Sequence, residues 1–313
     1  MVSQLTKPCD RYVDDSFPPD KMNAFDSLVT ADGSLTFYSI EFKQHFHNLH
    51  GAREEALEKF VLPCRVPLLA RQPEVRVLDI CFGLGYNSGV ALEQLYRLNP
   101  DCRVVLHALE RSPDVPLQAQ RMGVWSDWDF AVDWLHLIRT GGVQTASLEA
   151  YWHGGDARQT ITRVPTGFAD VVFFDPFAPS ACPELWTVDF FAEVARCMTR
   201  HGRLSTYSCA AAVRVAMQAV GFHIGSTPPV GRPWPGTIAA LTPTDLPALT
   251  LMELEHLQTR AAVPYRDPTL KEERDRIRLQ RQQAQQQSSL EATSRWKRRW
   301  AGQIASALQV NSS

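Results

Sequence analysis

Short apolar runs alternate with longer stretches of helical periodicity through the middle of the chain. The apolar runs predict seven strands, at residues 75–80, 103–109, 148–152, 169–174, 203–207, 222–225 and 237–241. Between them, the spacing of apolar residues predicts helices at 87–98, 188–199 and 210–220. Residues 113–147 read as largely helical. Strands that alternate with helices in this way favour an α/β fold with a mainly parallel, doubly wound sheet of seven strands.

A β-hairpin and a helix are predicted ahead of this alternating region. Short β-prone runs at 28–30 and 35–39 flank Asp32-Gly33, a dipeptide that is typical of hairpin turns. Residues 51–62 predict an amphipathic helix. Residues 1–26 are polar and interrupted by prolines, so we expect a loose leader. The expected boundaries are one domain over 27–245, with hairpin and helix at 27–63 and the alternating core from residue 75.

The chain changes character after Leu241. Residues 246–313 are expected to form a basic tail, either helical or partly disordered. Residues 260–300 hold 11 Lys and Arg against 5 Asp and Glu, although the whole chain has a net charge of −2. The segment from Ser294 to Trp300 sets basic residues between tryptophans, which can grip a phosphate backbone and stack on bases. A solvated terminal helix explains the same segment equally well.

Composition narrows the class of protein further. Seven cysteines show no zinc-binding spacing, and nine histidines form no convincing set of metal ligands, so we expect reduced thiols and no metal. The first 25 residues lack the apolar core of a signal peptide, and no apolar run approaches membrane-spanning length. These features predict a cytoplasmic protein that has no membrane partner.

A glycine-containing turn follows the strand at 75–80. Residues 78–87 read Leu-Asp-Ile-Cys-Phe-Gly-Leu-Gly-Tyr-Asn. This spacing lacks the third glycine of the dinucleotide fingerprint and the Lys-Ser/Thr of a phosphate loop. It suits a cationic nucleoside without phosphate, and S-adenosylmethionine is such a ligand; a tight turn without a ligand is the alternative. The candidate cofactor-binding residues here are Asp79, Gly83, Gly85 and Asn87.

Acidic residues also follow the next two predicted strands. Glu110 ends the second strand, where an acid can accept hydrogen bonds from both ribose hydroxyls, unless it is an ordinary surface residue. Gly155-Asp156 follows the third strand, so Asp156 can accept from an adenine amino group. It can also cap the following helix, and these two roles are compatible. Glu110, Gly155 and Asp156 therefore complete the candidate cofactor site.

The strand at 169–174 ends abruptly in Asp175-Pro176-Phe177-Ala178-Pro179. An Asp-Pro-aromatic turn resembles the way in which several amino-group methyltransferases hold the nitrogen that they alkylate. An amine attacks a methyl sulfonium only through its free lone pair, so the site must bind or generate the neutral amine. A carboxylate can orient the amine N–H groups and accept the proton that is lost. Asp175 is therefore the candidate catalytic residue; the alternative is a simple turn cap.

Five further residues are candidates for contact with the acceptor. Phe177 can pack against a planar base, and Pro179 stiffens the loop. Trp186 either fixes the far side of this loop or belongs to the core. Tyr207 ends the fifth strand, where it can line the pocket. Arg232 lies in a Gly- and Pro-rich loop, where it either meets a phosphate or is a solvated charge.

Over residues 27–241 the chain resembles the MnmC-like methyltransferases, which act on 5-aminomethyl-uridine derivatives at the tRNA wobble position. The resemblance rests on four motifs that occur in the family's order. The first two read Cys-Phe-Gly-Leu-Gly-Tyr-Asn at 81–87, and Phe-Asp-Pro-Phe-Ala-Pro at 174–179 with Pro-Glu-Leu-Trp-Thr at 183–187. The last two read Arg-Leu-Ser-Thr-Tyr-Ser at 203–208, and Val-Arg at 213–214 with Ala-Val-Gly-Phe at 219–222. The chain departs from the family at Cys81, where a glycine is usual, at Leu84, where a threonine is usual, and at Ala181-Cys182.

The resemblance implies a Rossmann-like, class I fold that binds S-adenosylmethionine. It further implies N-methylation of 5-aminomethyl-2-thiouridine in tRNA by a stand-alone, MnmD-type enzyme, because no second dinucleotide fingerprint is present. Two alternatives remain open. One is an enzyme that methylates small-molecule amines with the same pocket, and the other is a non-catalytic RNA-binding protein with a vestigial fold.

Overall fold

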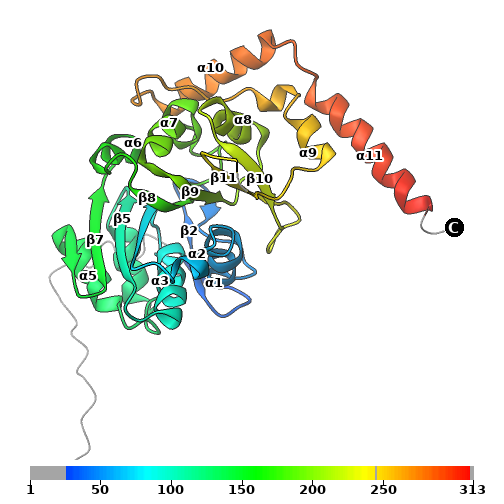
Figure 1. Ribbon diagram of the computed structural model, residues 1–313. Helices are drawn as coiled ribbons and strands as arrows, with labels where there is room; N and C mark the ends of the chain where they lie inside the picture. Colours follow the sequence, from blue (N-terminus) through cyan, green and yellow to red (C-terminus); the bar gives the residue numbers. More distant parts are fainter. Residues whose placement is uncertain (1–25, 244, 311–313) are drawn as a thin grey trace, which may run out of the picture.

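The computed structural model describes residues 26–243 and 245–310, and an eight-stranded sheet lies at the centre of the described part (Figure 1). The strand order is β10-β11-β9-β8-β4-β5-β7-β6. The parallel strands are β4 (Glu74–Ile80), β5 (Arg103–Glu110), β7 (Leu148–Gly154), β8 (Ala169–Phe174) and β9 (Met198–Thr206). β11 (Gly236–Ala240) and β10 (His223–Thr227) join one edge in antiparallel pairs. The predicted doubly wound, mainly parallel sheet is confirmed.

The eighth strand, β6 (Gly142–Gln144), was not predicted. It lies within residues 113–147, which the sequence suggested were largely helical; the helices there are α4 (Asp114–Arg121) and α5 (Ala131–Thr140). Gly141 ends α5 with a φ of 89°, in the left-handed region that favours glycine. The chain then turns back, and β6 pairs antiparallel with β7. A three-residue edge strand is too short to leave a periodic pattern in the sequence.

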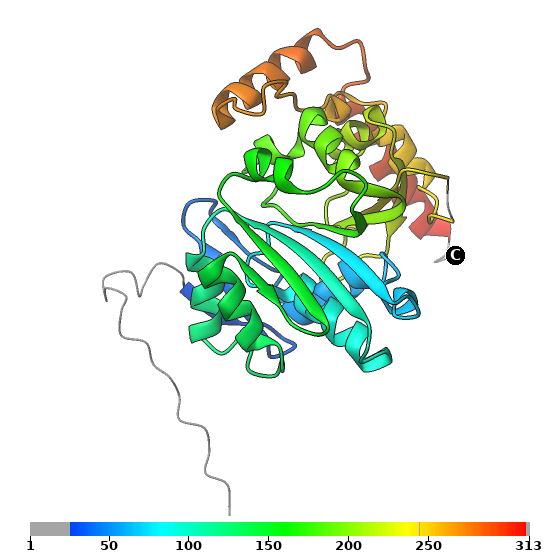
Figure 2. The same cartoon turned by 60° about the vertical axis from the view of Figure 1, so that its left-hand side comes forward.

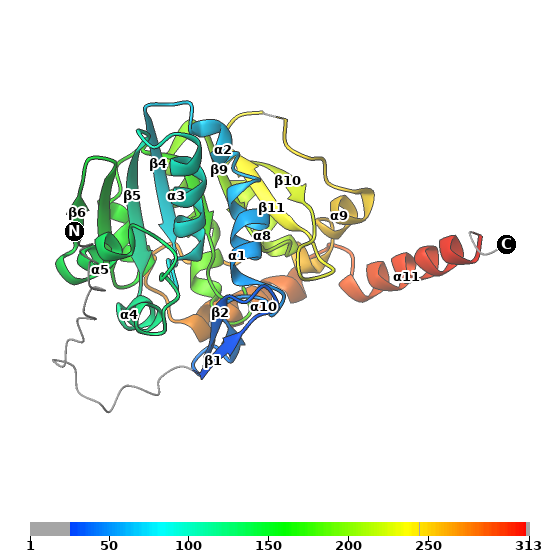
Figure 3. The same cartoon turned by 90° about the horizontal axis from the view of Figure 1, so that it is seen from below.

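Each central strand buries apolar side chains on both faces. In β4, Val75 and Val77 belong to one core cluster, whereas Leu78 and Ile80 belong to the other. Helix α3 (Tyr86–Leu98) covers the first face, and α7 (Val188–Cys197) and α8 (Ala211–Ala219) cover the second (Figures 1 and 3). Burial on both faces explains why these strands are continuous apolar runs rather than alternating ones.

The predicted hairpin forms a small sheet with a third strand. Its strands are β1 (Asp26–Val29), β2 (Leu35–Ser39) and β3 (Gln44–His45). The helix predicted at 51–62 begins as α1 (Ala52–Glu55) and continues as a π-helix, η2 (Ala56–Val61), before the short α2 (Val66–Leu69). Asp32 in the hairpin turn accepts a hydrogen bond from the backbone N–H of Glu54. The hairpin therefore fixes the start of this helix.

The basic tail is helical and contacts the body. Its helices are α9 (Leu251–His256), α10 (Arg274–Gln287) and α11 (Thr293–Val310), and they lie beyond the layer that contains α7 and α8 (Figures 1 and 2). Trp296 stacks on His256 with ring centroids 4.3 Å apart, and the Trp300 indole N–H donates to Glu255. These two rings are therefore engaged with α9. None of the helices in the described part is long and apolar enough to cross a membrane.

Residues 265–278, which we call the strap, carry the tail from α9 back across the body. Asp267 is fully buried and accepts a hydrogen bond from Arg158 at 2.9 Å. Arg266 pairs with Asp189 on α7 at 2.9 Å. The strap is thus bound both by ion pairs and by the burial of Tyr265 and Ile277 in the core cluster that contains α7 and α8.

Candidate active site

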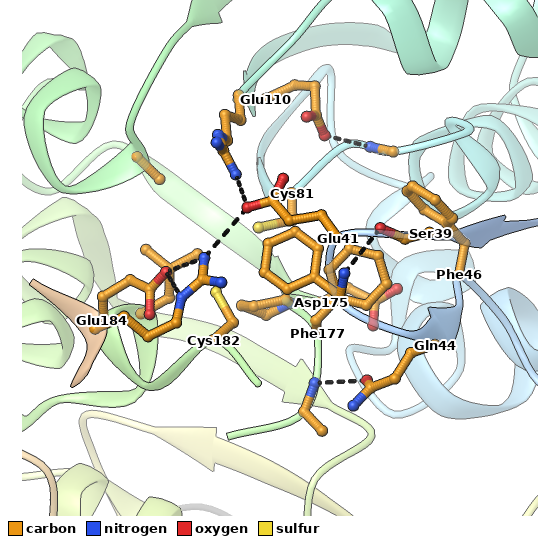
Figure 4. A pocket seen from close by; sticks show the side chains of 18 of the residues that line it. Ser39, Glu41, Gln44, Phe46, Cys81, Glu110, Asp175, Phe177, Cys182 and Glu184 are labelled. Carbon is orange, nitrogen blue, oxygen red and sulfur yellow. Dashed lines mark hydrogen bonds and ion pairs between the residues drawn. The ribbon is translucent and has the colours of Figure 1, made fainter. Parts of the chain in front are cut away.

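A cavity of about 900 Å³ opens where the parallel strands end (Figure 4). The predicted site residues that line it are Gly83, Glu110, Gly155, Asp156, Asp175, Phe177, Tyr207 and Arg232. The predicted site residues that do not line it are Asp79, Gly85, Asn87, Pro179 and Trp186. Ligands of open α/β sheets bind in this position, outside the carboxyl ends of the strands.

The glycine turn after β4 is held by the end of β5. The backbone N–H of Gly83 donates to Glu110 Oε2 at 2.9 Å. Gly83 lies in the left-handed region at φ 55°, and so does Cys81 at φ 69°. A left-handed conformation at position 81 explains why a glycine is usual there. The turn therefore presents its backbone to the cavity, as the sequence predicts for residue 83.

Gly85 is needed for packing and not for access to the cavity. A Cβ atom at this position would lie 2.8 Å from the Trp134 ring and 2.9 Å from the Phe82 ring. Gly85 also has a φ of 84° at the start of α3. Of the two glycines that were expected to approach a ligand, only Gly83 lines the cavity.

Asp79 lies beneath the turn. Its side chain is completely buried, and Oδ2 accepts a hydrogen bond from Ser88 Oγ at 2.6 Å. Burial raises the pKa of Asp79 to about 7. In this geometry the carboxylate ties β4 to α3 and does not face the cavity, contrary to the expectation that it meets the cofactor's cationic end.

The nucleoside end of the cavity lies over β5 and β7. Glu110 Oε1 accepts from the Ser112 N–H at 3.2 Å, and burial raises the pKa of this carboxyl. The Gly155 N–H donates to the Glu110 carbonyl at 3.0 Å. Asp156 caps α6 (Ala157–Thr160) by accepting from the Arg158 N–H at 2.9 Å, which confirms the capping role.

The charges at this end suit a nucleoside without phosphate. The Arg158 guanidinium pairs with Asp156 at 2.7 Å and with Asp267 at 2.9 Å, so its charge is already compensated. Glu110 adds a carboxylate at the position where hydrogen-bond acceptors for ribose hydroxyls are expected. The residues present therefore fit S-adenosylmethionine, and on binding Glu110 would face the ribose and the Gly155-Asp156 segment would face the adenine.

Asp175 lies at the other end of the cavity, where β8 ends. Its backbone N–H donates to the Ile80 carbonyl at 3.1 Å, and its Oδ2 accepts from Asn87 Nδ2 at 3.0 Å. Burial raises the pKa of Asp175 well above the ordinary range, and the nearby Glu55 carboxylate raises it further. Asn87, predicted to bind the cofactor, instead orients this carboxylate. A carboxylate with a raised pKa in a cavity is a candidate proton acceptor.

The loop after Asp175 is fixed by aromatic packing. Phe177 stacks on Phe42 with ring centroids 4.3 Å apart, and the edge of Phe46 meets it at 5.0 Å. Trp186 is completely buried and donates from its indole N–H to the Phe177 carbonyl at 2.8 Å. Trp186 therefore holds the loop from behind. This matches the expectation that Trp186 fixes the far side of the loop, and Trp186 does not line the cavity.

Tyr207 and Arg232 form the outer wall of the acceptor end. The Tyr207 hydroxyl donates to the Pro176 carbonyl at 2.9 Å, which ties β9 to the Asp175 loop. The guanidinium of Arg232 lies over the Tyr207 ring at 5.4 Å. Arg232 is exposed on its loop between β10 and β11, so its charge stands at the mouth of the cavity.

Several parts of the cavity wall were not predicted, among them Phe42 and Phe46 on either side of β3. Glu55 lines the cavity from the end of α1, and Arg274 and Arg278 line it from the strap. Arg278 donates to the carbonyls of Ser180 and Ala181, each at 3.1 Å. The departure from the family pattern at 181–182 therefore lies where the strap is bound. Arg274 pairs with Glu184 at 2.9 Å, and its guanidinium lies over the Phe42 ring at 4.7 Å.

Comparison with known proteins places this geometry in a family. Residues 132–242 match the family described as S-adenosyl-L-methionine-dependent methyltransferase. The crystal structure of MnmC2 from Aquifex aeolicus superposes with a TM-score of 0.71 at 30% identity, over 82% of this chain and 83% of that one. An uncharacterized protein of Methanocaldococcus jannaschii is 30% identical over 258 residues, which are 80% of this chain and 69% of the relative.

Longer relatives match as well. The bifunctional tRNA 5-methylaminomethyl-2-thiouridine biosynthesis protein MnmC of Cupriavidus necator is 27% identical over 240 residues, which are 72% of this chain. The match covers 36% of that protein, so the chain spans about a third of the bifunctional relative. The fold, the cavity and these likenesses agree, and the chain belongs to the MnmC-like family of S-adenosylmethionine-dependent methyltransferases.

Proposed function

We propose that the protein transfers a methyl group from S-adenosylmethionine to the 5-aminomethyl nitrogen of a wobble uridine in tRNA, including the 2-thiolated form. The observation that carries the proposal is Asp175, a half-buried carboxylate that lines the cavity at the end of β8 and accepts a hydrogen bond from Asn87. The name of the bifunctional relatives supports a tRNA acceptor. Because the proposed substrate is a tRNA, we also propose a cytoplasmic location.

Proton handling is the main chemical task of the protein groups. S-adenosylmethionine would supply an electrophilic methyl group. The acceptor nitrogen loses one proton to the Asp175 carboxylate and attacks the methyl carbon with the freed lone pair, while the electrons of the broken carbon–sulfur bond stay on sulfur. A raised pKa in Asp175 brings its basicity closer to that of an amine, so the transfer is less unfavourable. The remaining requirement is alignment of nitrogen, methyl carbon and sulfur.

Exposed basic residues could meet the tRNA backbone. Arg232 stands at the mouth of the cavity, and Arg295, Lys297 and Arg298 are exposed on α11. The engagement of Trp296 with α9 does not favour base stacking by that ring. We therefore propose that the tail contributes phosphate contacts, which are electrostatic and independent of sequence.

Methyl transfer with defined acceptors tests the proposal. The purified protein is incubated with S-adenosylmethionine and either tRNA that carries 5-aminomethyl-uridine or the free nucleoside, and the nucleosides are analysed by mass spectrometry. We expect the 5-methylaminomethyl product from tRNA and little product from the free nucleoside. Equal activity on the free nucleoside would indicate a small-molecule amine methyltransferase. Failure to bind S-adenosylmethionine in calorimetry would indicate a non-catalytic RNA-binding protein.

A further inference from the structure

Glu55 is a second carboxylate in the cavity, and it is more deeply buried than Asp175. It lines the cavity, although only 5% of its surface is exposed. It is the last residue of α1, at the point where the helix widens into the π-helix η2. Short π-helical segments occur frequently at functional sites, because the extra residue redirects side chains.

The Glu55 carboxylate is held firmly but is only half satisfied. Oε2 accepts from the Asn48 N–H at 2.8 Å, whereas Oε1 has no hydrogen-bond partner among the residues that the structure describes. Lys59, one turn further along, directs its Nζ to the Trp234 carbonyl at 3.3 Å and forms no ion pair with Glu55. The Glu55 charge raises the pKa of the buried Lys59, which burial lowers, so Lys59 offsets part of this charge without a direct ion pair. A cavity-lining carboxylate without a direct ion pair can bind a cationic group of a ligand.

Besides Lys59, the groups that the Glu55 charge influences lie on the acceptor side. The Glu55 charge helps to raise the pKa of Asp175 at the end of β8 and that of Tyr207 after β9, in both cases after burial. Glu110, at the nucleoside end, is influenced instead by its own burial and by neighbouring loop groups. Glu55 and Asp175 thus bring two carboxyl groups to the wall of the same cavity.

We propose that Glu55 binds the protonated aminomethyl group of the acceptor together with Asp175, and so selects a cationic acceptor over a neutral one. This inference rests on the proposed function. Asp175 becomes neutral when it takes the proton, and Glu55 then supplies the negative charge that remains. The methylated amine is cationic, so Glu55 also provides a countercharge for the product. Glu55 is therefore a specificity-determining residue, while Asp175 remains the proton acceptor.

Glu55→Gln tests the proposal, because it removes the charge and keeps the acceptor for the Asn48 N–H. Glu54→Gln is the matched control: the adjacent carboxylate is half-exposed and pairs with His50 outside the cavity. With 5-aminomethyl-uridine tRNA we expect the E55Q variant to raise KM for tRNA by about 10- to 100-fold, the range for a hydrogen bond to a charged group. The Kd for S-adenosylmethionine alone, measured by calorimetry, should stay within about twofold of wild type for both variants.

The pH profile gives a readout that a merely structural role would not move. Asp175 must be ionised to accept a proton, so kcat/KM for tRNA rises with pH through its pKa. Removing the Glu55 charge lowers that pKa, so the rise should move to lower pH in E55Q and stay in place in E54Q. The other titratable or charged groups that act on Asp175 or are acted on by it are Asp79, Cys81, Tyr207 and Arg232.

Binding measured without turnover covers the case of a poorly active variant. Wild-type protein saturated with S-adenosylhomocysteine should prefer an anticodon stem-loop with 5-aminomethyl-uridine over one with 5-hydroxymethyl-uridine, and E55Q should lose that preference. A loss of S-adenosylmethionine affinity with unchanged tRNA parameters would overturn the inference and assign Glu55 to the donor's ammonium group. Behaviour identical to E54Q, or no preference in wild type, would also overturn it. Wild type that does not methylate the aminomethyl tRNA at all would instead refute the proposed function, and the inference with it.

Discussion

Replacing Asp267 by alanine tests how strongly the strap is bound to the body. The Asp267 side chain is completely buried and accepts four hydrogen bonds, from Arg158 Nη1 at 2.9 Å and, each at 3.2 Å, from Thr269 Oγ1 and the N–H groups of Lys271 and Glu272. Removing one partner of a buried ion pair costs about 3–5 kcal/mol. Arg158 keeps Asp156 as a second partner, so we expect the lower end of that range, about 3 kcal/mol.

Urea denaturation measures the loss in the free energy of unfolding directly. Trypsin cleavage within residues 265–278 reports whether the strap is instead released locally from a folded body. Asp275→Ala is the matched control, because the Asp275 side chain is 91% exposed and pairs with Arg278 at the surface. An exposed pair contributes only about 0–1 kcal/mol. If D267A and D275A lose the same free energy of unfolding and are cleaved at the same rate, the strap is not anchored by Asp267 and the reasoning is wrong.

Three further predictions concern the site and the tail. Asp175→Ala should abolish methyl transfer, while calorimetry shows nearly unchanged affinity for S-adenosylmethionine. In the wild-type protein, the rate of methyl transfer should fall as the pH is lowered through the raised pKa of Asp175. Gly85→Ala should lower the free energy of unfolding by roughly 2–4 kcal/mol in urea titrations, because its Cβ would meet Trp134 at 2.8 Å in a left-handed backbone. Reversing the charges of Lys297 and Arg298 should weaken tRNA binding and flatten its salt dependence, with no change in S-adenosylmethionine affinity; an unchanged salt slope would exclude phosphate contacts by α11.

The sheet was predictable because its signals are local. An apolar run such as residues 169–174 is buried on both faces, and a strand of that kind is visible without knowledge of its neighbours. The residues at strand ends were predictable for the same reason, since parallel strands bring Gly83, Glu110 and Asp175 to one edge. What the pattern did not indicate was the direction of the Asp79 and Trp186 side chains, which depends on tertiary partners.

The parts of the cavity that could not be predicted come from distant segments. Glu55 was expected only as part of an amphipathic helix, and its place in the cavity depends on how the hairpin holds α1. Arg274 and Arg278 belong to a stretch with charge spacing typical of a solvated helix. Their partners are a carboxylate and two carbonyls far away in the chain, and such pairings have no signature in the sequence around either member.

The position of the strap also sets the order in which the site is completed during synthesis. Chains emerge from the ribosome N-terminus first, and folding follows that order where it can. Among the residues that line the cavity, Arg274 and Arg278 are synthesised after all the walls formed by the sheet, including the Gly83 turn, Glu110 and Asp156. A nascent chain released before residue 278 would hold the nucleoside end without the wall that fixes the loop at 180–184. The strap is thus the last part of the cavity wall to be synthesised, and it closes a cavity whose other walls are already made.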